Sequence, residues 1–63
     1  MEEITLKVEA SYGCKVQVGD IVEADKEIGN APRTGLPVKT PIAGTVKSID
    51  FNSKEHSFVI VIS

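Results

Sequence analysis

Apolar and polar residues alternate along much of this chain. Ile4, Leu6 and Val8 are separated by single polar residues, which is the period-two pattern of a strand with one buried face. The same pattern predicts extended segments at residues 4–9, 16–18, 21–22, 36–38, 45–51 and 58–62. The last segment is almost wholly apolar, so it shows no polar face. We therefore predict an all-β chain, with any helix limited to a turn or so.

Glycine and proline mark the boundaries of these segments. The clearest case is Ala31-Pro32-Arg33-Thr34-Gly35, where Pro32 presets one turn angle and Gly35 accepts the positive φ that closes many turns. The segment predicts a hairpin tip at residues 31–35 that contains Arg33 and Thr34. Further turns are expected at residues 11–13, 19–20, 41–44 and 52–56.

Composition supports the same fold class. Eight valines and seven isoleucines stand against two leucines, and β-branched side chains favour pleated sheet over helix. A chain of 63 residues has room for one domain, residues 1–63, with a small core. One cysteine (Cys14) and one histidine (His56) exclude an internal disulfide and a zinc site built from several Cys and His ligands.

A weak internal repeat relates the two halves of the chain. A shift of 30 residues superimposes four identical pairs, which are Leu6 with Leu36, Val8 with Val38, Val16 with Val46 and Asp20 with Asp50. Other apolar positions fall into the same register. The shift indicates two quasi-equivalent halves.

The net charge and the N-terminal residues limit the classes of function that we expect. Seven basic and nine acidic residues give a net charge of −2, and no basic run exceeds one residue, so we expect no direct nucleic-acid binding. No apolar run reaches the ~18 residues of a membrane span. The start Met1-Glu2-Glu3 is unlike a basic signal peptide, and a lone thiol suits a reducing compartment, so we expect a cytoplasmic protein. We interpret Cys14 as a half-buried apolar residue.

Three motifs in order resemble those of the biotinyl/lipoyl-attachment superfamily. They are Val16-x-x-Gly19-Asp20-x-Val22, the hairpin around Arg33, and Pro41-x-x-Gly44-x-Val46, within about residues 13–51. The resemblance implies a small, flattened antiparallel β-barrel of two quasi-symmetric halves, called a barrel-sandwich hybrid. This barrel is the fold that we expect.

In that family a lysine at the hairpin tip carries biotin or lipoate, and the resemblance places Arg33 at this position. A guanidinium stays protonated near neutral pH and cannot act as the amine nucleophile of acyl transfer, so we expect no cofactor attached at Arg33. Two lysines come closest to a substitute. Lys26 follows Asp25 in a dipeptide like the lipoyl one, and we interpret it as a solvated turn residue. Lys39 is expected to be exposed on a strand.

A variant of the same fold matches more closely. The chain resembles the non-lipoylated module in the peripheral subunit of Rnf-type ion-translocating electron-transport complexes through Gly19-Asp20, Ile28-Gly29 and residues 37–49. Lys39 and Ala43 depart from the residues usual in that group. The resemblance implies the module and not electron transfer, because a chain with one cysteine cannot ligate an iron–sulfur cluster.

No catalytic constellation is visible, so we expect a non-catalytic scaffold or docking module that binds another protein or a larger complex. Arg33 and Thr34 are one candidate contact, because an arginine on a protruding turn can pair with a carboxylate or phosphate. Phe58 and Ile60 are the other. Either the domain covers both faces of this strand, or one face contacts a partner or forms a homodimer. Two alternatives remain, a carrier domain modified at another lysine and a small oligonucleotide-binding barrel.

Overall fold

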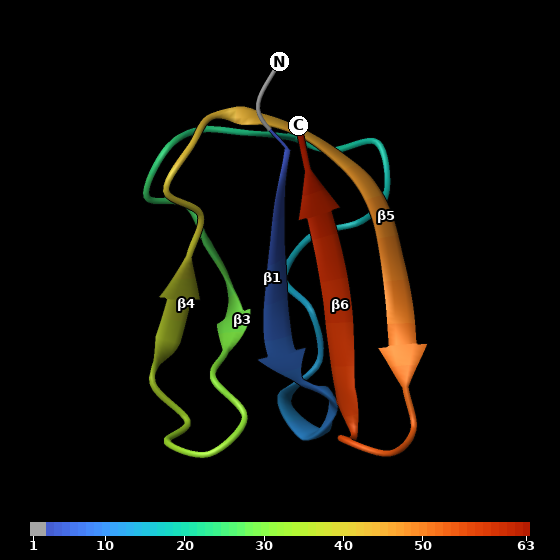
Figure 1. Cartoon of the computed structure of the whole chain (residues 1–63). Coiled ribbons are helices and arrows are strands. Elements are labelled where there is room, and N and C mark those ends of the chain that lie inside the picture. The colour runs from blue at the N-terminus through green and yellow to red at the C-terminus, as the bar shows by residue number, and fades with distance from the viewer. Residues whose placement is uncertain (1–2) are drawn as a thin grey trace.

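The computed structural model describes residues 3–63, and its regular structure is β-sheet with one short 3₁₀ turn (Figure 1). The strands are β1 (Ile4–Glu9), β2 (Ile21–Val22), β3 (Glu27–Asn30), β4 (Pro37–Lys39), β5 (Gly44–Asn52) and β6 (Ser57–Ile62), and the 3₁₀ turn η1 covers Ala10–Tyr12. The predicted all-β fold class is confirmed. Among residues 3–63, no helix is long and apolar enough to cross a membrane.

Two antiparallel sheets make up the domain. Strands β1, β6, β5 and β2 lie side by side in that order in a curled half-barrel, and β3 pairs with β4 in a separate hairpin (Figure 1). The hairpin packs beside β1, where Gly29 lies against Val8. A Cβ atom on Gly29 would stand 2.7 Å from the Cβ of Val8. Glycine at this position therefore allows the two sheets to approach each other closely.

The two sheets share one core. It contains the buried apolar residues Val8, Val16, Val22, Ile28, Val46, Ile60 and Ile62. In β6, Ile60 and Ile62 face this core together with the half-buried Phe58, because alternate side chains of a strand point to the same face. Val59 and Val61 lie on the other face and are half-buried. The domain thus covers one face of this apolar strand completely and the other face in part.

One predicted strand segment is wrong. The alternation of Val16 and Val18 predicts a strand, but residues 13–20 form turns and irregular backbone. The Asp20 amide donates to the Gln17 carbonyl at 3.0 Å, and the Asp20 carboxylate accepts from the Gln17 amide at 2.9 Å, so the chain closes a tight turn here. Val16 still reaches the core, whereas Val18 is 61% exposed. The turn chemistry of Asp20 overrides the local alternation.

The 30-residue shift in the sequence has a structural counterpart. Strand β1 pairs with β6 and β4 pairs with β3, so the shift exchanges one strand pair for the other. The register at one end of each ladder is the same. Glu9 pairs with Ser57 in the first ladder. Lys39, 30 positions after Glu9, pairs with Glu27, 30 positions before Ser57, in the second ladder.

Backbone hydrogen bonds just beyond these two ladders follow the same shift. The Ala10 amide donates to the His56 carbonyl at 3.0 Å, and the Thr40 amide donates to the Lys26 carbonyl at 3.0 Å. Adding 30 to the donor's number and subtracting 30 from the acceptor's converts the first bond into the second. The shift thus relates the β1–β6 pair to the β3–β4 pair at one end of each ladder. The halves differ in length, because β5 has nine residues and the matching stretch of the first half holds only the two-residue β2.

Candidate functional site

The hairpin tip at residues 31–35 is held closed by its own backbone and by one side chain. The Ala31 amide donates to the Leu36 carbonyl at 2.7 Å, and the Gly35 amide donates to the Ala31 carbonyl at 3.0 Å. Gly35 has a positive φ of 71°, and its carbonyl accepts a 2.9 Å hydrogen bond from the side-chain amide of Asn30. The predicted hairpin tip is confirmed, and its backbone is preorganised.

Arg33 and Thr34 are both exposed on this tip. The guanidinium of Arg33, the single arginine of the chain, forms no ion pair within residues 3–63. The Thr34 hydroxyl accepts a 3.3 Å hydrogen bond from the Leu36 amide, so it helps to close the tip. The uncompensated charge of the tip therefore belongs to Arg33.

Arg33 borders a pocket of about 300 Å³. Its lining comes from β1 (Lys7 and Glu9), from the hairpin tip (Pro32 and Arg33), and from the β5–β6 connection with the first residue of β6 (Glu55 and Ser57). These three parts of the chain meet at the end of the molecule away from the C-terminus (Figure 1). The antiparallel pairing of β1 with β6 brings the first and third parts together, and the hairpin closes the third side.

The acidic residues of this pocket already have partners. Lys7 Nζ lies 2.8 Å from Glu55 Oε1, and both side chains are half exposed, so water screens this ion pair. Glu9 Oε2 lies 2.9 Å from His56 Nδ1 and accepts a hydrogen bond from the Ser11 amide at 3.2 Å. The hydrogen bond with His56, followed by that from the Ser11 amide, holds the pKa of Glu9 below its usual value. Both carboxylates are thus engaged within the chain.

Ser57 differs from the other lining residues because it is fully buried. Its hydroxyl has no hydrogen-bond partner in the part of the chain that the structure describes. A buried hydroxyl without a partner costs about 1–3 kcal/mol, so such groups usually bind a ligand atom or an ordered water. Ser57 therefore adds a buried polar group without a partner to the pocket lining.

Ser11, His56 and Glu9 lie together in a combination that resembles a catalytic triad. In a triad the serine and the acid contact opposite nitrogens of the imidazole. Here the Ser11 hydroxyl at 3.5 Å and the Glu9 carboxylate at 2.9 Å both approach Nδ1. This geometry does not relay a proton from the serine through the ring. The sequence does not predict the cluster, because it depends on the contact between η1 and the turn that contains His56.

The second predicted contact, on β6, needs a correction. Ile60 has no exposed surface and belongs to the core, so it offers nothing to a partner. Phe58 is half-buried and packs against Phe51, with ring centroids 5.7 Å apart. Strand β6 is bonded to β1 on one side and to β5 on the other, so it has no free edge. The homodimer stays a prediction, and it would have to use the outer face with Val59 and Val61.

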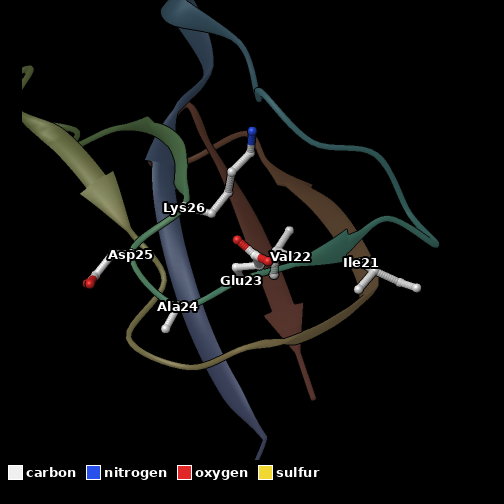
Figure 2. Close-up of a pocket in the computed structure, with 6 residues that line it drawn as sticks. All are labelled: Ile21, Val22, Glu23, Ala24, Asp25 and Lys26. Atoms are coloured by element: carbon white, nitrogen blue, oxygen red, sulfur yellow. The ribbon is translucent and has the colours of Figure 1, made fainter.

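A second pocket is lined by residues 21–26, in β2 and the loop that follows it (Figure 2). Lys26 is exposed, as expected, and Figure 2 shows its side chain and that of Asp25 pointing to opposite sides of the loop. Asp25 has a positive φ of 71°, and its amide donates to the Thr40 carbonyl at 2.7 Å, which pins the turn to the end of β4. Lys39 is exposed on β4, also as expected.

Two kinds of chemistry can be checked directly, metal binding and the reactivity of the Cys14 thiol. Within residues 3–63 there is no group of three or more side chains that could hold a metal ion. Cys14 is half-buried, as expected, and burial raises the pKa of its thiol, which disfavours the reactive thiolate.

Comparisons with known proteins returned no match. No family model matches the chain, and neither a curated protein nor a solved structure matches it significantly. The resemblance to the biotinyl/lipoyl superfamily therefore stays a prediction from the sequence motifs. The function has to be argued from the site itself.

Proposed function

We propose that this chain is a non-catalytic protein-docking module and that its hairpin tip contacts the partner. Arg33 carries the proposal, because its guanidinium is exposed and forms no ion pair within the described residues. A guanidinium presents a planar fork of donors that fits a carboxylate. The hydrogen-bonded turn that holds Arg33 loses little conformational entropy on binding, which favours a stable contact.

The surroundings of Arg33 support a protein as the partner. Tyr12 lies beside the tip, with its hydroxyl 3.5 Å from the position that a Cβ on Gly35 would take. Tyr12 and Leu36 are 64% and 63% exposed. Arginine and tyrosine are enriched in protein interfaces, where a large side chain combines apolar contact with a polar end. The tip thus offers one charge next to exposed apolar surface.

A capture experiment with matched baits tests the proposal. The C-terminus lies at the end of the molecule opposite the tip (Figure 1), so a tag placed there leaves the tip free. The baits are the wild-type chain, Arg33→Gln, and Lys54→Gln as a control. Lys54 is an exposed cation of the β5–β6 turn that does not line the pocket, so its substitution removes the same charge elsewhere.

We expect at least one protein that wild type and Lys54→Gln enrich equally and that Arg33→Gln enriches at least about tenfold less, as loss of a charge-assisted contact predicts. Equal recovery of every captured protein by all three baits would contradict docking through the tip. Circular dichroism of the three baits shows that the comparison is made between folded chains.

A carrier domain modified at another lysine is the alternative. The exposure of Lys26, directly after the turn residue Asp25, is the observation that favours it. Intact mass after co-expression with biotin and lipoate ligases separates the two functions. The docking proposal expects the unmodified mass. A stoichiometric adduct that Lys26→Arg abolishes and Lys39→Arg preserves would establish the carrier function in its place.

A further inference from the structure

The pocket beside the tip, which we call the tip pocket, has a charge pattern that selects its ligand. Lys7 is paired with Glu55, and Glu9 is hydrogen-bonded to His56. Arg33 adds one positive charge that has no partner among residues 3–63. A carboxylate ligand can pair with this guanidinium. The two carboxylates that line the pocket repel any anion, and they repel a doubly charged phosphate about twice as strongly as a singly charged carboxylate.

Ser57 supplies a second, independent feature of the tip pocket. This residue lines the pocket, and its buried hydroxyl lacks a hydrogen-bond partner within the described chain, so a ligand reaches that hydroxyl only after a small movement of the lining side chains. A hydroxyl donates readily to a carboxylate, and hydrogen bonds to an ionised group are stronger than neutral ones. A carboxylate between Arg33 and Ser57 would satisfy both the unpaired charge and the unpaired hydroxyl.

The size and position of the tip pocket suit a small group on a larger partner. Its volume of about 300 Å³ lies at the lower end of the range for ligand sites. This volume accommodates one side chain or one chain end. Pro32 and Arg33 belong to both the tip and the pocket, so a protein that contacts the tip also lies beside the pocket.

We propose that the tip pocket binds a carboxylate of the partner protein, with Arg33 as the ion-pair partner and the Ser57 hydroxyl as a hydrogen-bond donor. The carboxylate belongs to an aspartate or glutamate side chain or to a C-terminal residue. This inference rests on the proposed docking function and specifies the chemical group that the module recognises.

Acetate is the simplest probe of the tip pocket, because it is a single carboxylate. Amide NMR spectra are recorded during a titration with sodium acetate, and sodium chloride serves as the control for ionic strength. We expect saturable shifts at the amides of Arg33, Thr34 and Ser57, with a Kd on the order of 10 mM for so small a ligand. Chloride at the same concentration should not reproduce them.

Three variants assign the binding to the proposed groups. Arg33→Gln is expected to weaken acetate binding at least about tenfold, and Ser57→Ala about three- to tenfold, because each removes one charge-assisted interaction. Lys54→Gln should bind acetate like wild type. Ser57→Ala deletes a buried hydroxyl without a partner, so it is expected to fold, and a thermal melt confirms this before the titration.

Two pairs of short peptides distinguish the source of the carboxylate. The first pair is a capped peptide with one aspartate and its asparagine analogue, and the second is an uncharged peptide with a free C-terminus and its amide. Tighter binding of the aspartate peptide alone assigns a side chain. Tighter binding of the free C-terminus alone assigns a chain end. Binding of neither overturns the inference.

The acetate titration overturns the inference in three cases. These are shifts that rise linearly without saturation, shifts that chloride reproduces, and shifts that Arg33→Gln leaves unchanged. Failure here differs from failure of the docking proposal, because Arg33-dependent capture of a protein can persist without acetate binding. Loss of both results would reject both proposals.

Discussion

The two strand pairs related by the 30-residue shift have the same register at one end only, and they differ in setting. The pair β1 and β6 joins the first and last strands over six residue pairs inside a four-stranded sheet. The pair β3 and β4 is a local two-stranded hairpin whose register slips between Glu27 and Gly29. The β1–β6 pair therefore depends on contacts between distant parts of the chain, whereas the β3–β4 pair is closed by the turn that the six intervening residues form.

This difference explains where the candidate site lies. The shift carries residue 33, on the hairpin tip, onto residues 3 and 63 beside the two chain ends. The quasi-symmetry thus places the tip at the opposite end of the molecule from the open ends of the β1–β6 pair (Figure 1). The pair that builds the core is constrained by burial on its inner face. The hairpin closes locally, so its tip is free to present Arg33.

The comparison predicts that the β1–β6 pair carries most of the stability. Ile60→Ala removes a fully buried side chain of β6 and is expected to cost about 2–5 kcal/mol, which matches the roughly 3–5 kcal/mol that a core of this size supplies. The variant should therefore be largely unfolded by circular dichroism at 25 °C. Ile21→Ala, at a side chain that is 86% exposed, is the control and should shift the urea midpoint little. A cooperative urea transition of Ile60→Ala near the wild-type midpoint would contradict this view.

The contact between the two pairs is expected to be the next most sensitive point. A methyl group at Gly29 would stand 2.7 Å from the Val8 Cβ, so Gly29→Ala should push the hairpin away from β1 at a cost of about 1–3 kcal/mol. Gly19→Ala is the comparison, because Gly19 has a φ of 95° and open space around it. Its cost should be about 1 kcal/mol, from backbone strain alone.

Urea unfolding measures both costs, and amide NMR locates them. Gly29→Ala should shift resonances in β1 as well as in β3, whereas Gly19→Ala should shift those of its own loop. If Gly29→Ala perturbed only the hairpin, then the two pairs would not be coupled through this glycine.

The smallest expected effect is a pH dependence of the free energy of unfolding that arises from the β1–β6 pair. The pKa of Glu9 is lowered by its hydrogen bonds with His56 and the Ser11 amide, so this stabilisation is present above the usual carboxyl pKa of 4.5. This stabilisation is lost as the pH falls below about 4.5 and passes through the lowered pKa that Glu9 has in the folded state. Glu9→Gln should remove this part of the acid dependence of the urea midpoint. The 30-residue shift matches Glu9 of the first half with Lys39 of the second half. The amide resonances of β4 should therefore stay unchanged while Glu9 titrates. An unchanged acid profile in Glu9→Gln would contradict the assignment.

The local parts of the fold could be predicted from the sequence. The period-two pattern of Ile4, Leu6 and Val8 locates β1, and the Pro32 to Gly35 turn locates the hairpin tip. Both depend on residues that are near neighbours in the chain. The prediction of a strand at residues 16–18 failed for a local reason as well, since Asp20 bonds back to Gln17 and ends the extended backbone.

The tip pocket could not be predicted in the same way. Arg33 can be singled out in the sequence by its place on the tip, but nothing near Ser57 in the chain indicates a buried hydroxyl. Ser57 is buried because β6 lies between β1 and β5, and it lines the pocket because the hairpin packs beside β1. The assignment of Ile60 as a contact failed for a related reason, because an unbroken apolar run does not show which side chains face the core.

The sequence by itself determined that this protein is built from short strands and that a closed turn carries Arg33, and it indicated a weak repeat between the two halves. These properties follow from side-chain branching, alternation and turn chemistry, which act over a few residues. Tertiary structure decided which strands pair, which face of β6 is buried, and which charged groups meet beside the tip. Those outcomes depend on the register of strands far apart in the chain, and that register is set by the packing of the shared core.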